Sequence, residues 1–176
     1  MSGSRQSAGS RGTAAATLAV ALAAAVAGPA QARDVLGIFG RWGAFRDAAQ
    51  GRCFAIAEPT DPRDPRRGWA PFASIGFWPR QGVRGQVNLR LSRQLAQNAA
   101  ASLDIGDKRF TLKGGGADIW AGDRRDDAAI VAALRAGGTM AVHGRGRAGE
   151  SISDHYELRG AATAIDAAAL GCARIK

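Results

Sequence analysis

The chain has 176 residues, of which 24 are Lys or Arg and 15 are Asp or Glu, so its formal net charge is +9 at neutral pH. Such a basic excess suits partners with an anionic surface, such as lipid headgroups, phosphorylated saccharides or nucleic acid. Nucleic acid is excluded as the expected partner, because the basic residues are scattered rather than gathered in a stripe and no aromatic stacking platform accompanies them.

The N-terminal segment has the three parts of a secretory signal peptide. Arg5 and Arg11 supply a positively charged start, residues 13–28 form an apolar run, and small residues precede a cleavage point after Ala32. The apolar run has 16 residues, fewer than the roughly 20 that cross a bilayer core. We therefore expect an exported protein, periplasmic or secreted, that does not span a membrane. A short buried or anchoring helix is the alternative for this segment.

Removal of residues 1–32 leaves 144 residues with 22 basic and 15 acidic side chains, a net charge of +7. A chain of this length builds one ordinary domain with a hydrophobic core. We expect a signal peptide at 1–32 and a single domain at 33–176.

The first half of this domain has the pattern of short strands. Val87, Leu89 and Leu91 alternate with polar residues, which predicts a half-buried antiparallel strand. Prolines and charged residues separate the apolar runs and predict loops between them. The predicted elements are two hairpin strands at 38–47 and 53–57, a charged loop at 58–68, and further strands at 72–78 and 83–93.

The second half contains the best-supported helix, at 126–136. Acidic residues at its N-terminus satisfy free amides and the helix dipole, and Gly137 is expected to end it in the left-handed conformation. Three glycines at 114–116 are expected to interrupt regular structure. The other predicted elements are a hairpin of strands at 102–105 and 109–112, a brief strand or core plug at Ile119 and Trp120, and a short helix at 161–170.

The last predicted hairpin pairs residues 139–145 with 151–159. If Met140 faces Leu158 and Val142 faces Tyr156, every apolar side chain of both strands lies on one face, and His143 lies opposite His155 on the other. The whole pattern predicts an all-β fold. We expect an antiparallel β-sandwich or partly closed barrel, with one short helix at about 126–136 and a short C-terminal helical turn.

Cys53 and Cys172 are the only cysteines of the chain. An even count in an exported protein predicts one disulfide. A zinc site or a redox pair is the alternative, but no C-x-x-C spacing or Cys/His cluster supports it.

The two histidines are the main candidates for chemistry. Imidazoles across a strand pair bind zinc or copper when a third ligand converges, and Glu157 lies within diagonal reach of His143 and His155. Ser153 shares a face with His155, which makes a small hydrolase a further alternative. The sequence shows no G-x-S-x-G motif and no recognisable orienting acid for it. We therefore expect exposed histidines on a non-enzymatic protein, with no catalytic residue, metal or cofactor.

Most aromatic residues are candidates for the core, but two tryptophans next to prolines also suit a recognition loop. The candidate interaction surface comprises Trp69, Trp78, Arg80, His143 and His155.

Three stretches resemble the invasion-associated locus B family of exported bacterial proteins. They are Gly40-Arg41-Trp42-Gly43, residues 127–142 and residues 156–165. The resemblance implies an all-β envelope or secreted protein; some members are associated with host-cell invasion, and the family has no agreed enzymatic activity and no catalytic residues to transfer. We expect this chain to bind an envelope or host-surface component, such as a protein, a lipid headgroup or a saccharide.

Overall fold

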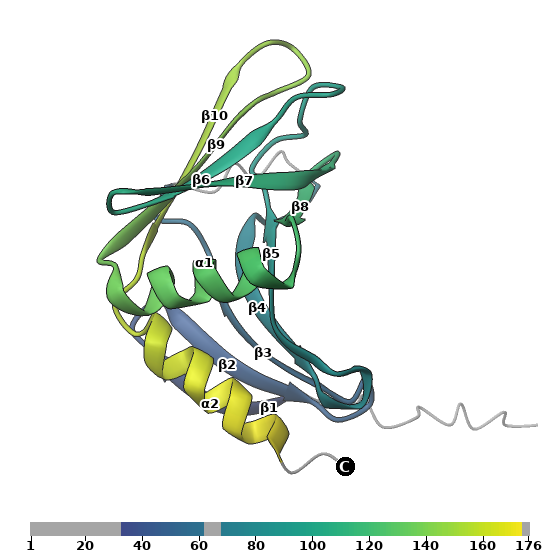
Figure 1. Ribbon diagram of the computed structural model, residues 1–176, viewed down its shortest axis with the longest axis vertical. Coiled ribbons are helices and arrows are strands. Elements are labelled where there is room, and N and C mark those ends of the chain that lie inside the picture. The colour runs from purple at the N-terminus through teal and green to yellow at the C-terminus, as the bar shows by residue number, and fades with distance from the viewer. Residues whose placement is uncertain (1–32, 62–67, 174–176) are drawn as a thin grey trace, which may run out of the picture. The chain divides into compact units, whose positions relative to one another are not determined.

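A single antiparallel sheet of ten strands dominates the computed structural model, which describes residues 33–61 and 68–173 (Figure 1). The sheet order is β1-β2-β3-β4-β5-β8-β7-β6-β9-β10, so β1 and β10 are its edges. The predicted signal peptide and residues 62–67 of the predicted loop lie outside the described residues. The strands are β1 (Asp34–Phe39), β2 (Trp42–Asp47), β3 (Arg52–Ala57), β4 (Phe72–Trp78), β5 (Val83–Arg90), β6 (Ala101–Ile105), β7 (Lys108–Gly115), β8 (Asp118–Ala121), β9 (Thr139–Arg145) and β10 (Ser151–Glu157).

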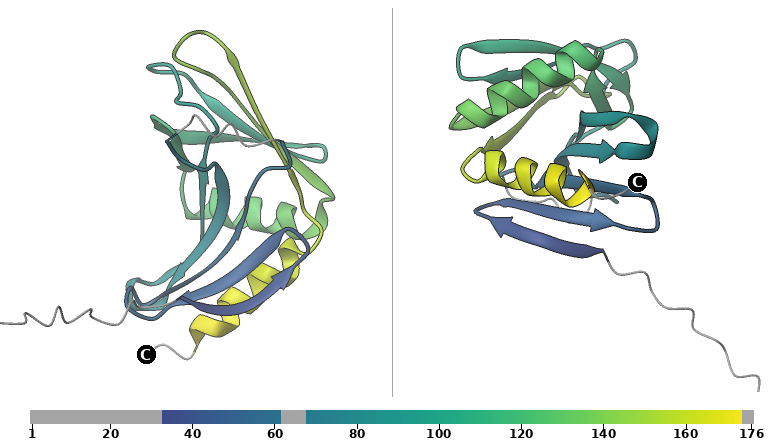
Figure 2. Two further views of the ribbon diagram at one scale, coloured as in Figure 1. Left: turned by 180° about the vertical axis from the view of Figure 1, so that it is seen from behind. Right: turned by 60° about the horizontal axis from the view of Figure 1, so that its bottom comes forward.

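Two α-helices, α1 (Arg124–Ala136) and α2 (Ala161–Ala173), lie on the inner face of the curled sheet (Figures 1 and 2). α2 packs across β1 to β4, whereas α1 packs against β5, β7 and β8. The predicted all-β class is confirmed, and the C-terminal element is a helix of 13 residues rather than a short turn. Within the described part of the chain, neither helix is long and apolar enough to cross a membrane.

Strand alternation separates the inner face of the sheet from the outer face. In β10, Ile152, Asp154 and Tyr156 are buried, whereas Ser153 and His155 are exposed. Successive side chains of a strand point to opposite faces, so the apolar residues of β10 join the core under the helices. The exposed residues of the same strand, Ser153 and His155 among them, are left on the outer face, and β5 alternates in the predicted way.

Two glycine-rich segments differ from the predictions. The predicted strand at 38–47 is two strands, because the chain turns between β1 and β2 at Gly40, whose φ of +62° costs glycine no strain. The glycines at 114 and 115 do not interrupt the sheet but pair with β8. A side chain at Gly114 would collide with the backbone of Asp118 and Ile119. Glycine therefore permits the close approach of β7 and β8.

The two ends of the sheet contact each other without pairing as strands. A side chain at Gly160, between β10 and α2, would collide with the backbone carbonyl of Phe39 at the end of β1. Trp42 is fully buried beside this contact, and its Nε1 donates to the carbonyl oxygen of Glu157 at 2.8 Å. The curl of the sheet thus brings the first hairpin against the end of the last one.

Helix α1 begins at Arg124, two residues before the predicted start, and has the acidic N-terminus that the sequence predicts. Asp123 is its N-cap and accepts hydrogen bonds from the backbone N–H groups of Arg125 and Asp126. The prediction for Gly137 is wrong, because this residue is extended, with φ of −83°. A Cβ atom at Gly137 would lie 2.8 Å from Ile105 Cγ2, so glycine is required here by packing rather than by a left-handed cap.

The predicted disulfide is confirmed: it joins Cys53 of β3 to Cys172 of α2, with 5.6 Å between their Cα atoms. Both cysteines are buried in the core. The bond therefore anchors the C-terminal helix to the inner face of the first half of the sheet.

Replacement of both cysteines by alanine should lower the free energy of unfolding by about 4 to 5 kcal/mol, because the bond closes a loop of 119 residues in the unfolded chain. Urea unfolding of both proteins measures the difference. Dithiothreitol provides a control: it should lower the stability of the wild type, which has the disulfide, and leave the stability of the double variant unchanged. Equal unfolding midpoints for the two oxidised proteins would contradict this account.

Gly160→Ala should destabilise the protein more than Gly82→Ala. Both glycines have positive φ, but only Gly160 has backbone atoms in the place of a Cβ, whereas Gly82 has nothing within 4 Å. Left-handed strain alone costs about 1 to 2 kcal/mol, so Gly160→Ala should cost that amount and at least about 1 kcal/mol more. Thermal unfolding compares the two variants, and an equal effect would show that the contact between the sheet ends is dispensable.

Candidate functional site

The pairing of β9 with β10 differs from the predicted register by two residues. His143 lies opposite Ser153, so the predicted pairing of His143 with His155 is wrong. A shift of two residues leaves every side chain on the same face, and the hydrophobic pattern therefore fits both registers. In the observed one, the strand ends Arg145 and Ser151 pair directly around the turn between them.

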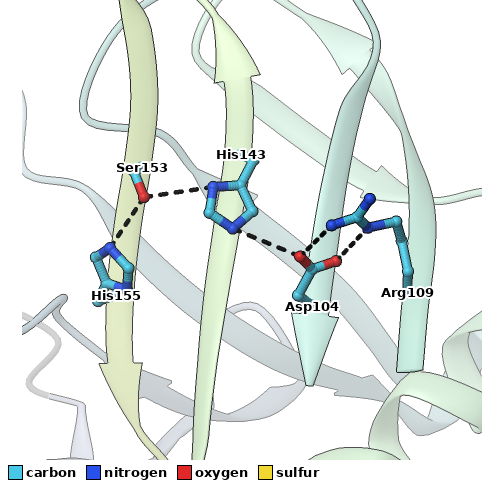
Figure 3. A network of polar contacts seen from close by, with 5 residues as sticks. All are labelled: Asp104, Arg109, His143, Ser153 and His155. Carbon is cyan, nitrogen blue, oxygen red and sulfur yellow. Dashed lines mark hydrogen bonds and ion pairs between the residues drawn. The ribbon is translucent and has the colours of Figure 1, made fainter. Parts of the chain in front are cut away.

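The observed register gathers two imidazoles around the hydroxyl group of Ser153 (Figure 3). Ser153 Oγ lies 2.9 Å from Nε2 of His155, its neighbour on the same face of β10, and 3.3 Å from Nδ1 of His143 across the strand pair. The two imidazole rings meet edge to face, with 6.3 Å between their centres. Both histidines are partly or fully exposed, as the sequence predicts.

The next strand adds a carboxylate to the cluster. β6 pairs with β9, which brings Asp104 Oδ2 to 3.6 Å from Nε2 of His143. Arg109 of β7 lies opposite Asp104 in the β6–β7 hairpin and donates from Nε and one terminal nitrogen to its two oxygens, at 2.7 Å each. The order of contacts is Arg109, Asp104, His143, Ser153, His155 (Figure 3). We call these five residues the serine–histidine cluster.

Electrostatics keep the carboxylate of this cluster ionised. The hydrogen bonds from Arg109, with smaller contributions from the charges of Arg109 and His143, hold the pKa of Asp104 below its ordinary value. An ionised carboxylate only accepts hydrogen bonds, and the Nε2–H tautomer of neutral His143 is the one that turns an N–H toward Asp104 Oδ2, 3.6 Å away. In that tautomer Nδ1 accepts from the Ser153 hydroxyl, and Ser153 Oγ accepts from His155 Nε2 when that nitrogen carries a proton.

A depression of about 320 Å³ adjoins the cluster on the outer face. Asp104 and His155 line it, together with Thr60 from the loop after β3. Thr60 is held there because its backbone N–H donates to the carbonyl oxygen of His155 at 2.7 Å, while Asp61 accepts from the His155 N–H. This loop covers part of the free edge of β10 and forms one wall of the depression.

The arrangement differs from that of a metal centre. The nitrogens of the two histidines converge on the hydroxyl of Ser153, and Glu157 contacts Arg159 instead of the imidazoles. Among the described residues, no group of three or more His, Cys, Asp or Glu side chains is placed to hold a metal ion.

A second candidate surface lies on the outer face of β1 to β5, the face turned away from α2. It consists of two adjoining depressions of about 340 and 210 Å³, which share Ile56 and Phe72. We call this surface the outer groove and define it by Arg33, Phe45, Arg52, Phe54, Phe72 and Trp78.

Glycines let the aromatic rings of the outer groove lie flat on the sheet. The Phe45 ring covers Gly43 and the Trp78 ring covers Gly76, since a Cβ atom at either glycine would collide with the ring two residues further along. Phe45 also stacks on Phe54 of the neighbouring strand, with 5.6 Å between ring centres. The result is a row of ring faces across β2, β3 and β4.

Arginines flank this row. The guanidinium groups of Arg52 and Arg33 lie 5.0 and 5.8 Å from the centre of the Phe54 ring, within cation–π range. Both also contact Asp47, at 3.7 Å from Arg33 and 3.6 Å from Arg52. Arg52 Nε is buried and has no hydrogen-bond partner among the described residues. Arg41 and Glu58 line the opposite end of the groove.

The predicted interaction surface is thus divided between separate places. His143 and His155 belong to the serine–histidine cluster, and Trp78 belongs to the outer groove. Trp69 is half-buried and donates from Nε1 to the carbonyl oxygen of Leu91. Arg80 lies exposed in the short 3₁₀ helix η1 (Pro79–Gln81).

Sequence reasoning missed Asp104 and Arg109 as members of the site. The predicted hairpin of 102–105 with 109–112 places them on neighbouring strands, but its connection at 106–108 does not give their pairing; in the structure the turn is 106–107, so Lys108 pairs with Ile105 and Arg109 with Asp104. No local signal places β6 beside β9, because these strands are separated by a hairpin, β8 and α1.

Comparison of the chain with protein-family models, with curated proteins and with solved structures finds no significant match.

Arg109→Gln should raise the pKa of Asp104 toward its ordinary value, because the charge-assisted hydrogen bonds that stabilise the carboxylate are lost. Carbon-13 NMR titration of the Asp104 carboxyl measures the change, with Arg109→Lys as the variant that keeps the charge but loses the paired geometry. The ion pair's contribution to stability is present above the unfolded-state pKa and is lost as the pH falls through the lower folded value. An unchanged titration in Arg109→Gln would show that Arg109 does not control Asp104.

Proposed function

We propose that the chain is an exported bacterial protein of the periplasm or the extracellular space, and that it binds an acidic saccharide of the envelope or host surface through the outer groove. The signal-peptide pattern of residues 1–32 supports export, and so does the buried disulfide, since such bonds persist in oxidising compartments. The resemblance to the invasion-associated locus B family is in keeping with this location.

The observation that carries the binding proposal is the pair of arginines over Phe54. Arg52 Nε makes no hydrogen bond among the described residues and only a 3.6 Å ion pair with Asp47 Oδ2, so its guanidinium fork keeps donor capacity for a bound carboxylate, whose geometry it matches. Arg33 stands on the same ring and gives a second cationic contact. Asp47 neutralises only part of this charge, because it is shared by both arginines.

The remaining lining of the groove suits a sugar rather than a lipid tail or a peptide strand. Ring faces such as that of Trp78 offer flat apolar contact, and Ser74, Gln86 and Asn88 beside it offer hydroxyl and amide partners for sugar hydroxyls. Binding sites of this kind combine apolar area with a few placed polar groups. The positive charge of the domain would attract a polyanionic chain before contact is made.

Trp78→Ala and Arg52→Gln should each weaken binding of an oligogalacturonate by about tenfold, the loss expected for one aromatic or charged contact of about 1.4 kcal/mol. Isothermal titration calorimetry measures the affinity of the mature domain. Leu170→Ala and Arg147→Gln are the matched controls, because they remove an exposed apolar side chain and an exposed arginine away from the groove.

A neutral galactose oligosaccharide of the same length should bind at least tenfold more weakly. If the domain binds phosphatidylglycerol vesicles but not the oligogalacturonate, its ligand is a lipid surface and the saccharide proposal is wrong. Equal losses in the groove variants and in the control variants would overturn the assignment of the groove.

A further inference from the structure

We propose that Ser153 is a catalytic nucleophile, activated by His143 and directed at short-chain carboxylic esters. This activity is independent of the outer groove. It rests on the order of contacts in the serine–histidine cluster, which is the order that a hydroxyl nucleophile needs: a base within hydrogen-bond reach, and an anion behind the base.

His143 is the base because of where its two nitrogens point. Nε2 faces the Asp104 carboxylate, so this nitrogen keeps the proton and Nδ1 presents its lone pair to Ser153 Oγ at 3.3 Å. Distances of this size shorten when substrate is bound in many hydrolytic sites. Asp104 touches no substrate in this scheme. It is a positioning residue that selects the tautomer of His143 and stabilises the imidazolium.

His155 supplies the donor that the transition state requires. Its Nε2 lies 2.9 Å from Ser153 Oγ, and an ester carbonyl attacked by Oγ would place its oxygen next to the same nitrogen. The Nε2–H group is therefore available to the oxyanion. Both backbone groups of His155 are bonded at the free edge of β10, its carbonyl oxygen to the Thr60 N–H and its N–H to the Asp61 carboxylate, which limits movement of this donor.

The reaction balances without a metal or cofactor. Ser153 Oγ attacks the carbonyl carbon, the O–C bond forms, and the hydroxyl proton passes to Nδ1 of His143. The bond to the leaving alkoxide breaks, and the alkoxide takes that proton and departs as an alcohol. Water then attacks the acyl-serine while His143 accepts its proton, the acid is released, and the proton returns to Ser153.

The surroundings indicate a small, polar substrate. The adjoining depression is about 320 Å³ and open, with Thr60, Asp104 and Glu157 among its lining. The charged groups that face the cluster are Asp104 and Arg109, which are paired with each other, and Asp61 at the His155 backbone. A short acyl group such as acetate fits this setting better than a long apolar chain.

The test is the hydrolysis of p-nitrophenyl acetate by the mature protein. Ser153→Ala should lower kcat/KM at least about 100-fold, and His143→Gln by a similar factor, the usual size of a lost general base. Ser151→Ala is the matched control, since Ser151 is an exposed serine on the same face of β10, and it should leave the rate unchanged. Hydrolysis that persists in Ser153→Ala would assign the reaction to the imidazoles alone and overturn the proposal.

A fluorophosphonate probe gives a readout that does not depend on turnover. Attack by Ser153 Oγ forms an O–P bond and expels fluoride, so mass spectrometry should find the label on Ser153, and His143→Gln should abolish it. A label on another residue, or none, would overturn the proposal.

Asp104→Asn tests the positioning role through the pH profile. Loss of the carboxylate makes protonation of the imidazole less favourable, so the acidic limb of kcat/KM should move to lower pH while the rate falls about tenfold. If the rate falls while the acidic limb of the kcat/KM profile stays at the same pH, Asp104 has only a structural role.

Two variants separate the hydrolytic proposal from the binding proposal. Saccharide binding should survive in Ser153→Ala, and ester hydrolysis should survive in Trp78→Ala.

Discussion

The contact between the two ends of the curled sheet is the constraint on which the rest of this structure depends. β1 and β10 do not pair, yet the turn beside Phe39 touches the backbone of Gly160, and Trp42 donates to Glu157. This contact holds the two ends of the curled, unclosed sheet together, and α1 and α2 pack on its inner face. The disulfide from β3 to α2 reinforces the same closure by holding the last helix on the first half of the sheet.

The contact between the sheet ends also determines which side chains lie on the outer face of the sheet. The inner face takes most of the buried aliphatic side chains, because both helices pack there, and the residues at alternate positions, polar and aromatic, are displayed outward. On β6, β7, β9 and β10 that outer face carries the serine–histidine cluster. On β1 to β5 it carries the outer groove. The loop that holds Thr60 belongs to the first half of the chain but lies along β10, which shows how the closure builds the walls of the cluster.

The two candidate surfaces owe their character to different physics. In the outer groove, glycines beneath Phe45 and Trp78 allow flat rings, and shared pairing with Asp47 leaves the arginines short of partners. In the cluster, Arg109 stabilises the charge of Asp104, and this charge orients the imidazole of His143. One surface is suited to recognition and the other to proton transfer, so a binding role and a hydrolytic role are compatible in one small domain.

The sequence by itself determined the class of fold, most of the strand positions, the acidic N-terminus of α1 and the disulfide, because alternation, capping residues and a pair of cysteines are local or countable signals. It also brought Ser153 and His155 to one face. Only the tertiary structure decided that His143 lies opposite Ser153, because registers two residues apart have the same faces. Only the tertiary structure places Asp104 in the serine–histidine cluster, because the pairing of β6 with β9 joins segments that are distant in the sequence. The extended conformation of Gly137 was likewise decided by tertiary packing. The residue lies close to Ile105 and does not adopt the left-handed conformation that is common at helix ends.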